Sequence, residues 1–137
     1  MERRDYLMTQ IQEMGFFLAK LVRRLRGLDD SLPANELFSE AGDALSTQFG
    51  WDLEELLFME DGDFIRLMEE NLLAEDHYEK MAQVFELLGD TTPVDEKIMH
   101  QGLYYRKALA ILRYLDLNSH TYSMERQTHI GALAGRL

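Results

Sequence analysis

Apolar residues recur every three or four positions through most of the chain, which is the spacing of one face of an α-helix. Near the N-terminus the spacing alternates between four and three, at Leu7, Ile11, Met14, Leu18, Leu21, Leu25 and Leu28. This pattern predicts a helix over residues 3–26 with an apolar seam that needs a partner helix. We expect the seam to be buried largely within one chain, and a homodimer contact is a candidate cover for its remainder.

Glycine, proline and capping residues divide the next part of the chain into shorter helices. Pro33 suits the first turn of a second helix, and Gly50 can adopt the left-handed conformation that ends it. A capping box at residues 52–55 predicts a short third helix through Met59. The acidic sequence around Gly62 is expected to be a turn before a fourth helix, over residues 64–71.

Three further segments complete the expected architecture. A fifth helix should run from about residue 75 to 88 and stop at Gly89. A sixth should begin at Thr92-Pro93, reach about Leu117 and lie centrally, because residues 103–117 are apolar nearly all round. Ser123 can cap a last helix. With no sustained period-2 alternation, we expect one all-α domain over residues 1–137, a compact antiparallel bundle of about seven helices.

Charge is segregated along the chain. Residues 29–96 hold 20 of the 25 carboxylates and only two cations, a net charge of −18, whereas the preceding and following segments carry +3 and +4. We expect the basic ends to lie beside this acidic middle. The uncompensated acid should then form one negative face that favours a basic partner. Its expected partner-binding residues are Glu69, Glu70, Glu75 and Asp76.

Two Glu-x-x-x-His pairs, Glu96/His100 and Glu125/His129, are the candidate metal ligands. Residues four apart share a helix face, but di-iron bundles use Glu-x-x-His with further inward glutamates. The chain has no cysteine, nucleophile elbow or phosphate-binding glycine loop. We therefore expect no metal, no cofactor and no catalytic residue, and we expect His77 to be solvated at a helix start. A metal-dependent or other enzyme using the two pairs is the alternative.

The overall charge bears on the class of partner. A net charge of −11 and a pI near 4.7 oppose nucleic-acid binding despite the basic clusters at both ends of the first helix. The sequence lacks an apolar run of 18 residues and a small-residue cleavage site after a hydrophobic segment. We therefore expect a cytoplasmic protein with no nucleic-acid or membrane partner.

Residues 103–112, with Tyr105, Lys107, Ala108 and Leu109, resemble the second helix of a tetratricopeptide motif. Ser123-Met124-Glu125-Arg126-Gln127 resembles the start of the next repeat, although the motif's Trp, Leu-Gly and terminal Pro positions are not matched. The whole chain is similar to a small family of uncharacterised all-helical bacterial proteins that end in this arrangement. The resemblance implies a tetratricopeptide-like C-terminal helix pair in a bacterial protein and no catalytic residues to transfer.

Together these features favour a helical protein-interaction or scaffold module without catalysis. Aromatic residues at helical spacing are most often core residues, and Tyr104 and Tyr105 are the candidates for lining the concave side of the C-terminal helix pair and binding a protein or peptide partner. Two other functions stay open. One is the metal-dependent or other enzyme, and the other is an acidic regulator that binds a basic partner through residues 29–96.

Overall fold

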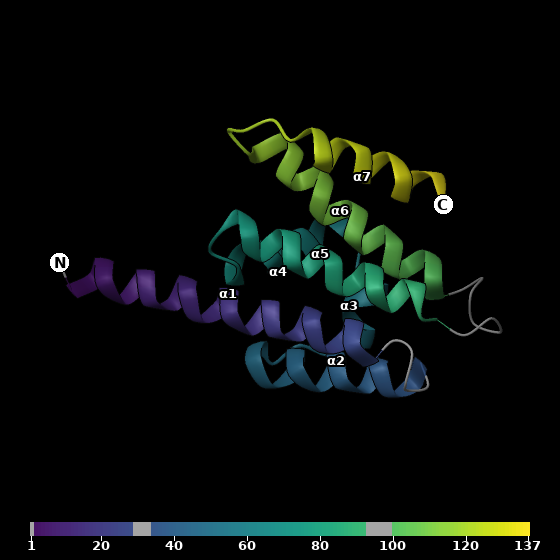
Figure 1. Cartoon of the computed structure of the whole chain (residues 1–137), viewed down its shortest axis with the longest axis horizontal. Helices are drawn as coiled ribbons and strands as arrows, with labels where there is room; N and C mark the ends of the chain where they lie inside the picture. The colour runs from purple at the N-terminus through teal and green to yellow at the C-terminus, as the bar shows by residue number, and fades with distance from the viewer. Residues whose placement is uncertain (1, 29–33, 93–99) are drawn as a thin grey trace.

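The computed structural model describes residues 2–28, 34–92 and 100–137. Over these ranges the chain forms seven helices and no strand, which confirms the all-α fold (Figure 1). The helices are α1 (Glu2–Leu28), α2 (Ala34–Phe49), α3 (Leu53–Phe58), α4 (Asp61–Asn71), α5 (Glu75–Asp90), α6 (Gly102–Asn118) and α7 (Met124–Gly135). The predicted start of the sixth helix at Pro93 and the candidate ligand Glu96 lie outside the described residues.

Three residues that the sequence predicts at helix ends have the expected capping geometry in the structure. Gly50 has a φ of +75° immediately after α2, the left-handed conformation that a residue with a Cβ rarely adopts. The Asp52 carboxylate accepts a hydrogen bond of 3.0 Å from the backbone N–H of Glu54 at the start of α3. The Ser123 hydroxyl accepts one of 3.1 Å from the N–H of Arg126 at the start of α7. These three helix boundaries are confirmed.

Two glycines lie inside helices, although the sequence predicts Gly62 in a turn before the fourth helix and Gly89 at the end of the fifth. Gly62 lies inside α4, which begins at Asp61, and Gly89 lies inside α5, which continues to Asp90. A Cβ on Gly89 would lie 2.7 Å from Cε1 of Tyr105 and 3.2 Å from Cβ of Tyr104. Glycine at this position therefore allows α6 to approach α5 closely, and packing rather than helix termination explains it.

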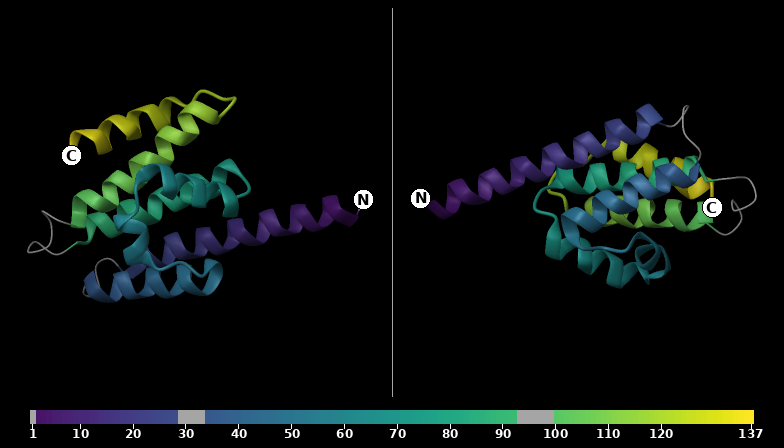
Figure 2. Two further views of the ribbon diagram at one scale, coloured as in Figure 1. Left: turned by 180° about the vertical axis from the view of Figure 1, so that it is seen from behind. Right: turned by 90° about the horizontal axis from the view of Figure 1, so that it is seen from below.

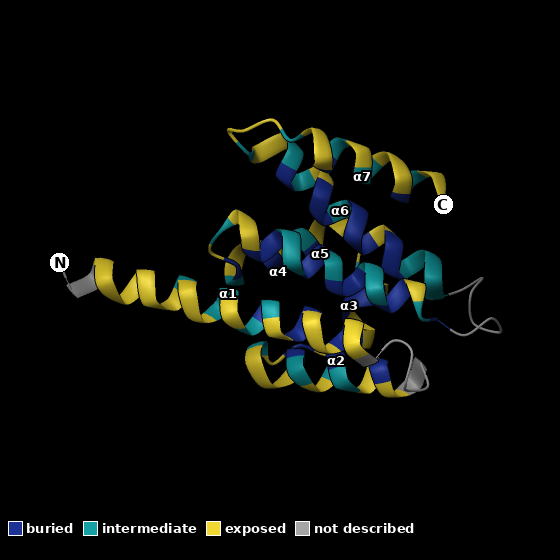
Figure 3. Ribbon diagram, viewed as in Figure 1, coloured by how far each residue is buried: buried dark blue, intermediate teal, exposed yellow. Residues whose placement is uncertain are grey.

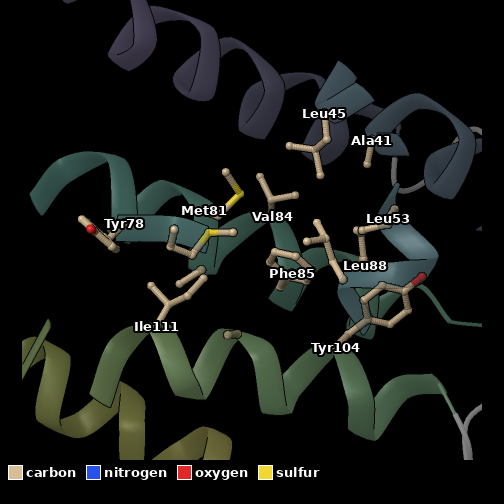
Figure 4. Packing of buried hydrophobic residues seen from close by; sticks show 14 of the residues in the cluster. Ala41, Leu45, Leu53, Tyr78, Met81, Val84, Phe85, Leu88, Tyr104 and Ile111 are labelled. Carbon is tan, nitrogen blue, oxygen red and sulfur yellow. The ribbon is translucent and has the colours of Figure 1, made fainter. Parts of the chain in front are cut away.

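The centre of the fold is formed by α5 together with α6. On one side α5 packs against α6, and on the other it packs against α1 and α2, while α3 and α4 lie against α6 (Figures 1 and 2). Figure 4 shows Met81, Val84 and Phe85 of α5 between Leu45 of α2 and Ile111 of α6. All five of these side chains have no exposed surface. The last helix, α7, packs on α6, so it lies at one side of the bundle.

Candidate functional site

The N-terminal part of α1 extends beyond the helices that cover the rest of it (Figures 2 and 3). Every residue from Arg4 to Gln10 is exposed, whereas Leu18 and Leu25 are 0% and 1% exposed. On the same seam Leu7 is 47% exposed. Burial within one chain is therefore confirmed for the seam at Leu18, Leu21 and Leu25, whereas its N-terminal part is exposed in the single chain and a homodimer cover for it stays a prediction. The N-terminal part of α1 is exposed because the first turn of α5, which begins at Glu75, lies beside the middle of α1. The turns of α1 before that point are not covered by α5.

His77 fixes the point at which α1 leaves the body of the protein. Its ring is 1% exposed, so the expectation of a solvated histidine is wrong. Nδ1 accepts a hydrogen bond of 3.1 Å from the N–H of Leu73, which leaves the proton on Nε2. Nε2 then donates to the carbonyl oxygen of Ile11, at 2.9 Å. One imidazole thus joins the α4–α5 connection to the middle of α1.

Exposed apolar side chains occur on three segments at the end of the molecule from which α1 projects. The N-terminal end of α1, the α4–α5 connection and the α6–α7 connection all lie toward this end (Figure 1). Their exposed large apolar residues are Tyr6, Leu7 and Met8 of α1, Leu73 before α5, and Leu117, Tyr122 and Met124 around the α6–α7 connection. We call this part of the surface the projecting end. These exposed apolar side chains make the projecting end the candidate binding surface for another macromolecule.

The acidic residues expected to bind a partner border the projecting end. Glu69 and Glu70 are in the last turn of α4, and Glu75 and Asp76 are in the first turn of α5. All four residues are exposed, and Asp76 forms an ion pair with Lys80 one turn further along α5. Burial, the hydrogen bond with Tyr114 and the charge of Glu69 raise the pKa of Tyr78 well above its ordinary value. The chemistry here is therefore apolar surface beside uncompensated carboxylates.

Part of the acidic middle is compensated by the basic ends of the chain, as expected. The contacts between these segments are the ion pairs Arg24–Glu40 (3.0 Å), Lys107–Asp61 (2.9 Å), Arg126–Glu79 (2.9 Å), Arg136–Asp90 (3.3 Å) and Arg136–Glu86 (3.8 Å), and the hydrogen-bonded pair His129–Glu86 (2.6 Å). Four of them join α7 or its C-cap residue, Arg136, to positions of α5 that follow Glu75. Charge compensation within the fold therefore spares Glu69, Glu70 and Glu75, for which no ion pair with another described residue is present.

Tyr104 and Tyr105 are core residues, which corrects the expectation that they line an exposed groove. They are 5% and 4% exposed, and both pack over Gly89 of α5. The Tyr105 hydroxyl donates a hydrogen bond to Asp90. Because Gly89 has no side chain, α5 approaches α6 closely enough to bury both tyrosines. Neither ring is available to a partner in this arrangement.

The structure separates the Glu125/His129 pair, whereas Glu96 of the other pair lies outside the described residues. His129 contacts Glu86 of α5 rather than Glu125 of its own helix, and Glu125 is exposed. His100 packs edge-on against Phe58, with ring centroids 6.4 Å apart. Across the described ranges, three or more His, Asp or Glu side chains do not come together in a geometry that could hold a metal ion. Because Glu96 lies outside these ranges, the enzyme alternative stays a prediction.

A search of family models, curated proteins and solved structures finds no match to this chain. Within the described residues, none of the helices is sufficiently long and apolar to cross a lipid bilayer. The tetratricopeptide-like character of the C-terminal pair and its bacterial relatives stay predictions. The site must therefore be interpreted from its own geometry.

The raised pKa of Tyr105, a buried tyrosine of α6, leads us to expect that the protein loses stability at alkaline pH. Burial, reinforced by the hydrogen bond to Asp90, raises the pKa of Tyr105 from 10.0 to about 12. Because the folded state holds this proton more tightly than the unfolded chain, its contribution to stability is complete below pH 10 and is lost as the pH rises toward 12. The free energy of unfolding should fall by up to about 1.4 kcal/mol per pH unit in this range.

Urea unfolding of Tyr105→Phe at a series of pH values tests this expectation. The variant should be less stable near neutrality, because it lacks the bond to Asp90, and should lose less stability between about pH 10 and 12. Tyr6→Phe is the control, since Tyr6 is 66% exposed and should leave the slope unchanged. An unaltered slope in Tyr105→Phe would mean that another group causes the alkaline loss.

Proposed function

We propose that this protein is a non-catalytic helical interaction module that binds a protein or peptide partner through its projecting end. The observation that carries the proposal is the apolar seam of α1, which is buried at Leu18 and then continues, exposed, past Ile11 into solvent. If the apolar seam of α1 stopped where the other helices stop covering it, it would need no partner. A seam that continues in the same register is typical of a helix that packs against a second surface.

The carboxylates beside the seam indicate the chemistry of the partner. Glu69, Glu70 and Glu75 remain exposed and uncompensated among the described residues, next to the apolar surface. A partner with an apolar stripe flanked by lysines or arginines would satisfy both features. The interaction module and the acidic regulator are then the same function. The apolar residues of α1 would supply most of the contact area, and the carboxylates would select a basic partner. The cytoplasm stays the predicted location.

Affinity purification from the native host with wild type and matched variants tests the proposal. Leu7→Ser/Met8→Ser removes exposed apolar surface from the projecting end, whereas Leu137→Ser removes a comparable side chain, 55% exposed, from the C-terminus at the opposite end. The specific partner should be captured by wild type and by Leu137→Ser but not by the α1 variant. Once it is identified, its Kd should rise by about tenfold or more in the α1 variant, equivalent to about 1.4 kcal/mol.

Neutralising the carboxylates separates the acidic contribution from the apolar one. Glu69→Gln/Glu70→Gln/Glu75→Gln should slow association at low salt and leave the melting temperature nearly unchanged, since exposed charges contribute at most about 1 kcal/mol each to stability. Stopped-flow association at two salt concentrations measures this. Equal capture by all variants, with no salt dependence, would show that the projecting end is not the binding surface.

A further inference from the structure

A groove on a different part of the surface runs between α1 and α2. Its volume is about 370 Å³, and its floor consists of Phe17, Leu21 and Ala44. The residues that line it recur at one helical face in both helices, positions 17, 20, 21 and 24 of α1 and positions 40, 43, 44 and 47 of α2. The two helices are antiparallel, as Figure 1 shows, so the groove follows both of them for about two turns.

The two walls of the groove carry opposite charge. Lys20 and Arg24 belong to the α1 wall, and Glu40 and Asp43 belong to the α2 wall. Arg24 and Glu40 form an ion pair of 3.0 Å across one end. Lys20 and Asp43 are exposed and form no ion pair with a described residue. The surface therefore has a basic half and an acidic half on either side of an apolar strip.

We propose that this groove is a self-association surface, at which two copies of the chain meet face to face. A twofold axis parallel to the helices places α1 of each copy along α2 of the other, and each basic wall then faces an acidic wall. Because Arg24 lies level with Glu40, Lys20 lies level with residues 43 and 44 in the antiparallel pair. Lys20 of each copy therefore meets Asp43 of the other, and the contact forms twice.

Charge selects this axis over the other face-to-face arrangement. A twofold axis perpendicular to the helices would place α1 on α1 and α2 on α2, which brings like charges together. The favoured arrangement instead joins two helical pairs into a four-helix layer with Phe17 and Leu21 at its centre. Phe16, one turn before Lys20, is 73% exposed and would lose exposed surface in the same contact. The surface is small, so the dimer should be weak and sensitive to salt.

Sedimentation equilibrium of charge-reversal variants tests the proposal. Lys20→Glu and Asp43→Lys should each weaken dimerisation by about tenfold or more, because each creates two like-charge contacts. Lys20→Glu/Asp43→Lys should restore it to within about threefold of wild type, since the pair is reversed in both places. Asp43→Lys makes a chain with a net charge of −11 less negative, so general repulsion between copies would predict stronger association of this variant, which is the opposite result.

Arg113→Glu provides the control, because Arg113 is an exposed cation of α6 and should not change association. Circular dichroism establishes that each variant is folded. A wild type that stays monomeric at millimolar concentration overturns the proposal, as does a double variant that stays dissociated. Stronger association of Lys20→Glu would establish the perpendicular axis instead. Leu7→Ser/Met8→Ser should dimerise normally, so failure here and failure of the projecting end as a partner site are distinguishable.

Discussion

Leu18→Asp is expected to lower the free energy of unfolding by about 3 kcal/mol or more, enough to unfold much of the protein at room temperature. Leu18 has no exposed surface and lies where the seam of α1 packs into the core. An aspartate there would lose its hydration without a compensating cation nearby. Urea denaturation followed by circular dichroism measures the change. A variant that unfolds at the wild-type midpoint would show that α1 is not packed as described.

Leu7→Asp is the matched control on the same seam. Leu7 is 47% exposed, so the new carboxylate stays hydrated, and the expected change in stability is within about 0.5 kcal/mol. The two substitutions are chemically identical and eleven positions apart on one helical stripe. A large difference between them is therefore a direct measure of where the body of the protein stops covering α1. Equal losses would indicate that the N-terminal part of α1 is covered as well.

The parts of the fold that the sequence predicted are those decided within a few residues. The cap at Asp52 and the left-handed glycine at Gly50 depend on neighbours no more than four positions away. Helix periodicity is equally local, and for this reason the all-α class and most helix positions were predictable. The seam of α1 illustrates the limit. Its spacing is the same at Leu7 and Leu18, and only the position of α5 makes one exposed and the other buried.

The incorrect expectations concern residues whose partners are distant in the sequence. His77 bonds the carbonyl of Ile11, 66 positions away, and nothing near His77 distinguishes it from a solvated histidine. Gly89 faces Tyr105 rather than ending α5, because two helices happen to cross there. The exposure of Tyr104 and Tyr105 could not be predicted for the same reason. A helix that is apolar nearly all round gives no indication of which of its faces the neighbouring helices cover. The acidic candidates are exposed, because the uneven charge of the chain leaves a surplus of acid that the basic ends cannot neutralise, and their role in binding a partner stays a prediction.

Lys107 is the buried cation that charge counting could not distinguish from a surface lysine. Its side chain is 2% exposed. Nζ donates hydrogen bonds to the carbonyl oxygen of Met59 and to Asp61, and it lies 5.1 Å from the centroid of the Phe64 ring. These contacts join α6 to the connection between α3 and α4. The ammonium is therefore stabilised by a carbonyl, a carboxylate and an aromatic face in place of water.

Substitutions at this position should separate packing from charge. Lys107→Ala is expected to cost about 3 kcal/mol or more, because it removes a buried four-carbon stem and leaves the Met59 carbonyl without its donor. Lys107→Met keeps most of the stem and should cost about 1–2 kcal/mol. Asp61→Asn should cost about 1 kcal/mol, since that side chain is 49% exposed and its amide oxygen can still accept a hydrogen bond. Chemical denaturation gives all three values.

Arg66→Ala is the control for an ion pair without burial. Arg66 is 73% exposed and lies 3.7 Å from Asp63 one turn away on α4, so its removal should change stability by less than about 0.5 kcal/mol. The order Lys107→Ala, Lys107→Met, Asp61→Asn, Arg66→Ala, from largest loss to smallest, follows from burial and not from charge. If Lys107→Met were as damaging as Lys107→Ala, the charged hydrogen bonds would outweigh the packing of the stem. If both were harmless, Lys107 could not be holding the α3–α4 connection against α6.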